Sequence, residues 1–217
     1  MRYLRVLPYR LVRVISLAAA AAGLAALASA CGSSETAPAP GRTPVSPIIR
    51  VDPPVAIDDF ELVDQHGDAY RLHDDDRPAR LFYFGYTSCP DICPSTMVDW
   101  REAKHDLGSR ATDVGFVMVT VDPPNDTPDV LAEYLAHFDE AFVGLSGTEE
   151  QLRRAWDAFG IEVKRLNLPE SATQHSISHP ASIFVIDGND ELVMKLAFDA
   201  DPEDIVEGVT ELLEDEE

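Results

Sequence analysis

Residues 83–97 read Y-F-G-Y-T-S-C-P-D-I-C-P-S-T-M, with two cysteines between an apolar run and a segment of helical periodicity. The run Leu81 to Gly85 is typical of a buried strand, so Cys89 and Cys93 lie where a strand gives way to a helix. The amide groups and the dipole at a helix start favour a thiolate and can lower a cysteine pKa from about 8.5 to about 7 or below. A thiolate is both the nucleophile of disulfide exchange and a soft metal ligand, so this motif permits two chemistries.

The first 30 residues have the composition of an export signal. Arginines at positions 2, 5, 10 and 13 precede an Ala- and Leu-rich run over residues 14–30, a pattern typical of secretion. Cys31 follows directly and resembles the lipid-accepting cysteine of a bacterial lipoprotein. The alternative is a single uncleaved N-terminal transmembrane anchor, because a run of this length is at the lower limit for spanning a bilayer. Both interpretations place the domain at the extracytoplasmic face of the cell membrane, anchored by lipid or by a helix.

The charge of the chain argues against nucleic acid as a partner. The 217 residues include 17 Lys and Arg and 39 Asp and Glu. Removal of residues 1–30 takes away four arginines and no acids, so 13 basic residues remain against 39 acidic ones. Phosphate binding needs clustered cations, which this composition does not supply. We interpret the acids as a solvated surface.

The number of cysteines favours a reactive pair. If Cys31 carries lipid, only Cys89 and Cys93 of the chain's three cysteines remain in the exported domain. A disulfide that closes so short a loop stabilises a fold little, because the entropic benefit grows with loop length. In an oxidising compartment, the pair is therefore expected to react rather than to brace the fold.

The remaining chain divides into a linker and one domain. Residues 31–54 are rich in Pro, Ser and Thr, so we expect a lipidated cysteine and a flexible tether there, and a folded domain over residues 55–217. The domain is predicted to contain, in order, a β-hairpin within residues 60–72, strands at 81–85, 114–121 and 141–145, each followed by a helix, a second hairpin at 182–198 and a final helix from residue 201.

This order indicates an α/β domain with a mixed central sheet flanked by helices and an N-terminal β-hairpin. A dithiol that ends the first core strand and opens the first helix makes the domain thioredoxin-like. Two local geometries fit the three-residue spacing. A helix that begins near Pro90 places both sulfurs on one face. A helix that begins at Pro94 makes Cys93 its cap. In either geometry the sulfurs can form a disulfide or chelate a metal.

Two histidines are candidates for a nitrogen ligand that would complete a metal site with the two cysteines. Two thiolates can hold a cuprous ion, but a site for both copper oxidation states needs a harder donor such as imidazole. Residues 173–187 read T-Q-H-S-I-S-H-P-A-S-I-F-V-I-D, which places His175 and His179 just before a buried strand. In a thioredoxin-like fold the loop entering this strand lies against the dithiol, so either ring can reach it.

Three sequence blocks resemble the Sco/SenC family over roughly residues 55–213. They are F-G-Y-T-S-C-P-D-I-C-P at 84–94, V-D-P-P-N-D-T-P at 121–128, and the histidine ahead of S-I-F-V-I-D. Members of this family are extracytoplasmic thioredoxin-like proteins that bind copper and help to assemble the binuclear CuA centre in subunit II of cytochrome c oxidase. The resemblance therefore implies copper as cofactor and this subunit as partner.

The resemblance also implies the ligands. The family's two cysteines and one histidine correspond here to Cys89, Cys93 and His179. His179 is preferred to His175 because it stands five residues before Phe184, the spacing that the family shows. Asp122 ends the central strand at the same edge of the sheet, so it is a candidate to hold a ligand in place. A turn residue before two prolines is an equally good interpretation of Asp122.

Three functions use these residues. The first, which we favour over an enzyme, is a monomeric metallochaperone in which the reduced dithiol and His179 hold Cu(I) or Cu(II) and oxidation to a disulfide destroys the site. The second is a thiol–disulfide oxidoreductase that reduces the cysteines of the CuA site. The third is a copper or redox sensor with a regulatory partner.

Overall fold

One large sheet organises the computed structural model, which describes residues 46–167 and 175–215. In the described part of the chain the sheet has eight strands in the order β1-β10-β9-β4-β5-β6-β2-β3. β4, β5 and β6 run parallel, and the other pairings are antiparallel, so the predicted mixed sheet is confirmed. The strands are β1 (Ile48–Ala56), β2 (Glu61–Asp64), β3 (Ala69–Arg71), β4 (Ala79–Gly85), β5 (Val114–Thr120), β6 (Val143–Ser146), β9 (Ile183–Asp187) and β10 (Glu191–Leu196).

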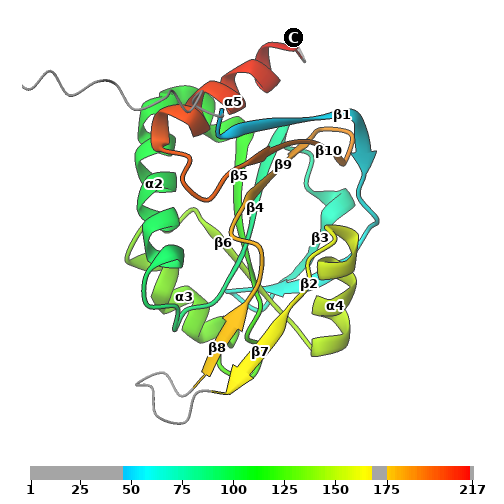
Figure 1. The fold of residues 1–217 in the computed structure, drawn as a ribbon, viewed down its shortest axis with the longest axis vertical. Helices are drawn as coiled ribbons and strands as arrows, with labels where there is room; N and C mark the ends of the chain where they lie inside the picture. The colour runs from blue at the N-terminus through cyan, green and yellow to red at the C-terminus, as the bar shows by residue number, and fades with distance from the viewer. Residues whose placement is uncertain (1–45, 168–174, 216–217) are drawn as a thin grey trace, which may run out of the picture. The chain divides into compact units, whose positions relative to one another are not determined.

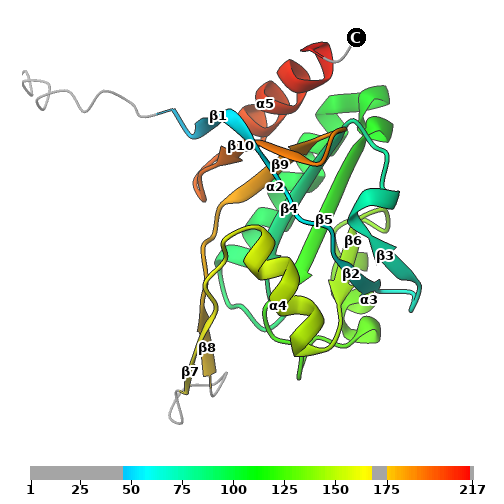
Figure 2. The same cartoon turned by 90° about the vertical axis from the view of Figure 1, so that its right-hand side faces the viewer.

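Helices cover both faces of this sheet. Figure 1 shows α2, α3 and α5 on one side and α4 on the other, and Figure 2 gives the view turned by 90°. None of the helices in the described ranges is long and apolar enough to span a bilayer. The helices are α2 (Ile92–Leu107), α3 (Pro128–Ala136), α4 (Glu149–Ala158) and α5 (Pro202–Asp215), with short 3-10 segments η2 (Leu72–Asp74) and η3 (Gly108–Asp113).

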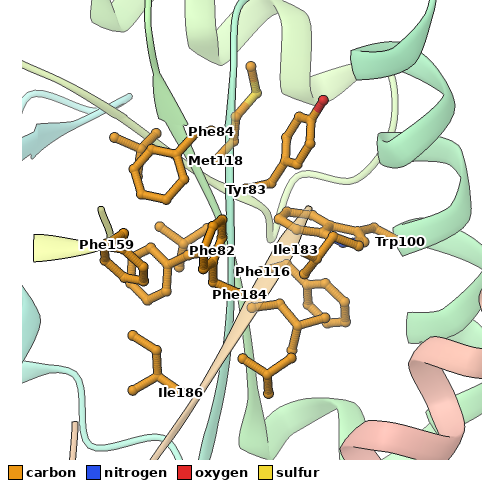
Figure 3. Close-up of a cluster of buried hydrophobic side chains, with 14 of the residues drawn as sticks. Phe82, Tyr83, Phe84, Trp100, Phe116, Met118, Phe159, Ile183, Phe184 and Ile186 are labelled. Carbon is orange, nitrogen blue, oxygen red and sulfur yellow. The ribbon is translucent and has the colours of Figure 1, made fainter. Parts of the chain in front are cut away.

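β4 is buried along its whole length, and its side chains alternate between the two faces. Tyr83 meets Trp100 of α2 edge to face, with ring centroids 6.2 Å apart. Phe82 and Phe84 point the other way and contact Phe159, which follows α4, at 5.0 and 5.1 Å. Figure 3 shows these two aromatic groups on opposite sides of the strand. Packing on both faces therefore fixes the carboxyl end of β4, where the cysteine loop begins.

The helix caps and hairpins that were predicted from local sequence signals are present in the structure. The Thr127 side chain caps α3 by accepting from the Val130 amide, and Thr148 and Gln151 form a capping box at the start of α4. The two predicted hairpins are β2–β3 and β9–β10. With the dithiol after β4 and the hairpin and helix at the C-terminal end, the topology is thioredoxin-like, as predicted.

Two parts of the fold differ from the sequence prediction. Residues 48–54 were expected within the flexible tether, but they belong to β1, which pairs with β10. The irregular stretch after α4 contains an antiparallel hairpin, β7 (Lys164–Asn167) and β8 (His175–Ser178). The predicted export signal, Cys31 and the first part of the tether lie outside the described residues.

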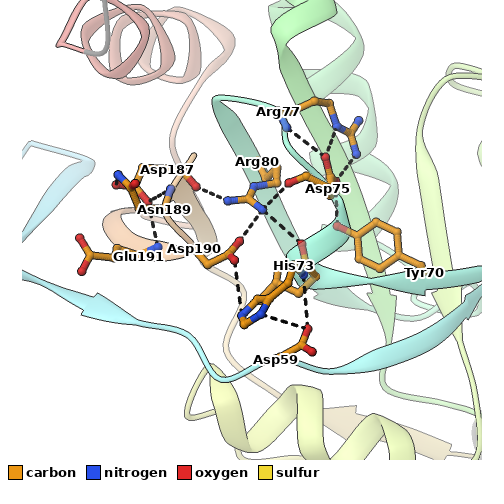
Figure 4. Close-up of polar contacts among 11 residues, drawn as sticks. Asp59, Tyr70, His73, Asp75, Arg77, Arg80, Asp187, Asn189, Asp190 and Glu191 are labelled. Atoms are coloured by element: carbon orange, nitrogen blue, oxygen red, sulfur yellow. Dashed lines mark hydrogen bonds and ion pairs between the residues drawn. The ribbon is translucent and has the colours of Figure 1, made fainter.

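A buried arginine joins the segments at the end of the sheet opposite the cysteines. Arg80 lies in β4 and is 1% exposed. Its guanidinium donates to the Asp190 carboxylate at 2.6 Å, to the Asp75 carbonyl at 2.7 Å and to the Asp187 carbonyl (Figure 4). The side chain therefore ties the β9–β10 turn to the segment before β4.

Replacing this arginine is expected to destabilise the domain. Arg80→Met leaves the Asp190 carboxylate without its cation and should lower the free energy of unfolding by about 3 kcal/mol in urea denaturation. Arg153→Met is the matched control, because the Arg153–Glu149 pair is exposed on α4 and should change the free energy by less than about 0.5 kcal/mol. Equal effects of the two substitutions would contradict this account of Arg80.

Candidate dithiol and metal site

The two cysteines occupy different positions around the start of α2. Cys89 lies in the loop after β4, and Cys93 lies in the first turn of the helix, which begins at Ile92. The helix thus starts between the two starting points considered from the sequence. Gly85 permits this close packing, because a Cβ atom there would lie 2.6 Å from the Tyr83 ring and 3.1 Å from the Cys93 sulfur.

The two free thiols differ in exposure and in acidity. Cys93 is fully buried, whereas Cys89 is partly exposed. The Cys89 sulfur accepts a hydrogen bond from Cys93 and from the backbone amides of residues 91 and 93, which lowers the pKa of Cys89 to about 5. The same bond to Cys89, together with burial, raises the pKa of Cys93. At neutral pH the pair therefore holds one proton on Cys93 and presents a thiolate at Cys89.

The ring of His179 stands beside this pair. His179 follows β8, and its ring meets those of Tyr86 and Tyr83 edge to face, with centroids 6.0 and 6.4 Å apart. Its Nδ1 lies 2.9 Å from the Pro180 carbonyl oxygen. Because a carbonyl only accepts, this bond places the proton on Nδ1 and leaves the Nε2 lone pair of the neutral ring for another partner.

A single pocket joins the cysteine loop to the histidine segment. Its volume is about 250 Å³, and Cys89, Ile92, Ser176 and His179 are among the residues that line it. Within residues 46–167 and 175–215, no three Cys, His, Asp or Glu side chains are gathered closely enough to hold a metal ion. The donor types suit copper, which accepts thiolate and imidazole ligands, but binding by all three requires the two sulfurs and the imidazole to come closer together than they lie here.

His175 and Asp122 relate to the hairpin that precedes His179. His175 is the first residue of β8, and its side chain lies outside the described part of the structure. The buried carboxylate of Asp122 accepts from Arg165 of β7 and from the Asn125 side chain. Arg165 pairs across the hairpin with Ile177 of β8. Asp122 therefore anchors the hairpin that leads to His179.

Tyr86 forms a second attachment for the same hairpin. Its hydroxyl is hydrogen-bonded to the Ile177 backbone and to the Ser176 side chain, and its ring contacts that of His179. No role for Tyr86 was predicted from the sequence, although it stands three residues before Cys89. Its place in the cysteine motif was the only available signal.

Asp126 attaches the cysteine loop to the sheet, and this role was not predicted from the sequence. This fully buried carboxylate accepts from the Thr87 hydroxyl and the Thr120 hydroxyl, each at 2.6 Å. Burial raises the pKa of Asp126. Because Thr87 precedes Cys89 by two residues and Thr120 ends β5, Asp126 fixes the loop to the neighbouring strand.

Comparison with known proteins identifies the family. The SCO1/SenC family model matches residues 51–214. The chain belongs to the SCO1/SenC family. A SCO2-like protein of Rickettsia felis is 36% identical over 149 residues, which cover 69% of this chain and 73% of that protein. Protein SenC of Rhodobacter capsulatus is 31% identical over 150 residues, covering 69% and 67%. The family predicted from the cysteine motif is therefore confirmed.

Solved structures give the same assignment. Copper-bound ScoI of Bradyrhizobium japonicum matches with a TM-score of 0.67 and 26% identity, covering 73% of this chain and 99% of that one. Apo Sco1 of Thermus thermophilus matches with a TM-score of 0.69 and 28% identity, covering 79% and 99%. The SCO1/SenC match begins within β1, in agreement with the corrected start of the domain.

The shared proton predicts the pH dependence of Cys89 alkylation. The rate with iodoacetamide should rise around pH 5, because the pKa of Cys89 is lowered to about 5. Cys93→Ala removes the sulfur donor and should move the midpoint toward the ordinary value of about 8.5. Peptide mapping by mass spectrometry separates Cys89 from the other cysteines. A wild-type midpoint near 8.5 would contradict the shared proton.

Proposed function

We propose that this chain is an extracytoplasmic, membrane-tethered copper-binding protein that assists assembly of the CuA centre in subunit II of cytochrome c oxidase. Cys89, Cys93 and His179 hold one copper ion as cargo. The observation that carries the proposal is the pocket at the start of α2, where the Cys89 thiolate and His179 line one cavity and the Cys93 thiol is hydrogen-bonded to Cys89. Two sulfurs and one imidazole nitrogen are a donor set that accommodates cuprous and cupric ions.

Named relatives support copper as the cargo. The Bradyrhizobium ScoI structure has copper bound. A relative from Stutzerimonas stutzeri is named for copper binding and is 33% identical over 132 residues, which cover 60% of this chain and 64% of that protein. Family membership together with the thiol pair therefore favours copper over a metal that prefers oxygen ligands.

The three residues have separate tasks in loading and release. Cys89 meets copper first, because its thiolate lines the pocket, and Cys93 loses its proton to solvent when its sulfur becomes a ligand. His179 completes the donor set through Nε2, because its Nδ1 faces the Pro180 carbonyl oxygen. Oxidation of both thiols to a disulfide, with two electrons passing to a partner disulfide, removes the sulfur ligands and releases the ion.

The localisation of the protein is part of the proposal. Cys31 carries the lipid that tethers the domain to the outer face of the cell membrane, or residues 14–30 remain as an N-terminal anchor. The composition of residues 1–31 supports this placement. The tether brings the monomeric domain to the membrane surface on which an oxidase exposes its copper-binding subunit.

Substitution of each ligand should affect copper differently. Cys89→Ser or Cys93→Ser should abolish tight binding of either copper ion, because a neutral hydroxyl is a poor ligand for it. His179→Ala should mainly weaken the cupric form, and His175→Ala is the matched control with wild-type binding. Competition with a chromophoric chelator and the cupric absorption spectrum measure these effects. Wild-type cupric spectra in His179→Ala, with loss in His175→Ala, would identify the other imidazole as the ligand.

A specific observation favours a second function, thiol–disulfide exchange. The partly exposed thiolate of Cys89 and the buried thiol of Cys93 are arranged as an attacking and a resolving sulfur. Cys89 attacks a partner disulfide, forms a mixed disulfide and releases one partner thiolate. Cys93 then loses its proton and attacks the Cys89 sulfur. The second partner thiolate leaves, so the partner is reduced and this chain holds the disulfide.

Trapping distinguishes this reductase from a copper carrier. Cys93→Ser should accumulate a mixed disulfide with the oxidised CuA domain, visible on a non-reducing gel, because the resolving sulfur is gone. Cys89→Ser should accumulate none, since Cys93 is buried. If His179→Ala reduces the CuA domain at the wild-type rate, the result supports the reductase. If Cys93→Ser fails to form the mixed disulfide, the result counts against it.

A further inference from the structure

The hydroxyl group of Tyr83 is hydrogen-bonded to the sulfur of Cys93. Tyr83 lies in β4, is fully buried, and donates a hydrogen bond from its hydroxyl to the Cys93 sulfur at 3.4 Å. The Thr96 side chain is a second hydrogen-bond partner of this hydroxyl. In Figure 3 the hydroxyl points toward the carboxyl end of the strand, where the cysteine loop begins. Without this bond to sulfur, a tyrosine in a buried strand would be interpreted as a residue of the hydrophobic core.

The surroundings hold this ring in place. Trp100 of α2 meets it edge to face at 6.2 Å, and the His179 ring lies at 6.4 Å. Gly85 faces it so closely that a Cβ atom would come within 2.6 Å of the ring. The hydroxyl therefore has little freedom to leave the sulfur.

We propose that Tyr83 is a positioning residue that hydrogen-bonds the Cys93 sulfur and stabilises it as a thiolate during copper binding and disulfide exchange. The copper part of this inference rests on the proposed function. A phenol carries its proton at neutral pH, so the Tyr83 hydroxyl acts as the donor in this bond. In the thiol pair Cys93 gives its hydrogen bond to Cys89, and its sulfur receives one hydrogen bond from the Tyr83 hydroxyl and one from the Tyr86 backbone amide.

This bond affects both chemistries of the site. A hydrogen bond to a charged sulfur is stronger than one to a neutral atom, and a disulfide sulfur is the weaker acceptor, so the bond favours the dithiol over the disulfide. Hydrogen bonds around a cysteine sulfur also tune the potential of a copper ion bound to it, because they withdraw electron density from the ligand.

Tyr134 supplies a matched control. It lies in α3, and its hydroxyl is also buried, but it has no hydrogen-bond partner among the described residues. Both tyrosines lose one buried hydroxyl on change to phenylalanine and keep their rings. Only Tyr83→Phe removes a bond to sulfur. The two variants are compared with wild type in the full chain, with Cys31→Ser in all three proteins so that one thiol pair remains.

The first measurement uses the metal-free proteins. After equilibration in glutathione redox buffers, Tyr83→Phe should shift the dithiol–disulfide equilibrium about 10-fold toward the disulfide, which corresponds to a potential about 30 mV more negative. Tyr134→Phe should equal wild type. If the two variants shift equally, or if Tyr83→Phe changes only the unfolding midpoint, Tyr83 is a core residue and the proposal is overturned.

The second measurement uses the copper-loaded proteins. In Tyr83→Phe the sulfur-to-copper charge-transfer band of the cupric form should move to longer wavelength, because the sulfur electrons are no longer stabilised by a donor. The same band in both variants would overturn the copper part of the inference. Failure of wild type to bind copper would contradict the proposed function, whereas the metal-free equilibrium would still decide the role of Tyr83.

Discussion

One proton shared by two sulfurs governs the chemistry of this site. Cys93 is buried and keeps the proton, and its hydrogen bond stabilises the thiolate of Cys89 in the pocket. The fold sets this asymmetry, because β4 ends at Gly85 and α2 begins only at Ile92. One cysteine therefore lies in an accessible loop and the other in a covered helical turn. Both metal binding by the two sulfurs and disulfide exchange require removal of the proton on Cys93.

The histidine is held on a separate element with its own attachments. Asp122 binds Arg165 of β7, and Tyr86 binds Ser176 and the backbone of β8, so the hairpin is fixed to the sheet on both of its strands. These attachments bring His179 into the pocket of Cys89 without completing a three-ligand site in the described residues. Copper binding as proposed would therefore require the two sulfurs and the His179 ring to come closer together than they lie here.

The sequence predicted the elements whose signals are local. The cysteine motif, the caps at Thr127 and Thr148, and the apolar run of β5 each lie within a few residues of the structure they specify. β1 was missed because Pro53 and Pro54 interrupt its pattern, and its partner β10 lies far away in the chain. The β7–β8 hairpin was missed because residues 161–178 lack the apolar alternation of a strand.

The candidate site residues were predicted from equally local signals. Cys89, Cys93 and His179 followed from the motif and from the family resemblance, and two of them line one pocket. The supporting roles of Tyr83, Tyr86 and Asp126 depend on contacts between separate elements, and a buried tyrosine or aspartate carries no sign of them in its own sequence neighbourhood. Asp122 was predicted as a candidate to hold a ligand in place, and its partner Arg165 could be found only in the fold.

The most direct test of the account is X-ray absorption spectroscopy at the copper edge of the reduced, copper-loaded protein. The account predicts two sulfur scatterers and one imidazole in wild type, with the imidazole contribution lost in His179→Ala. A copper environment with no sulfur, or with an imidazole contribution that persists in His179→Ala, would contradict a site built from Cys89, Cys93 and His179.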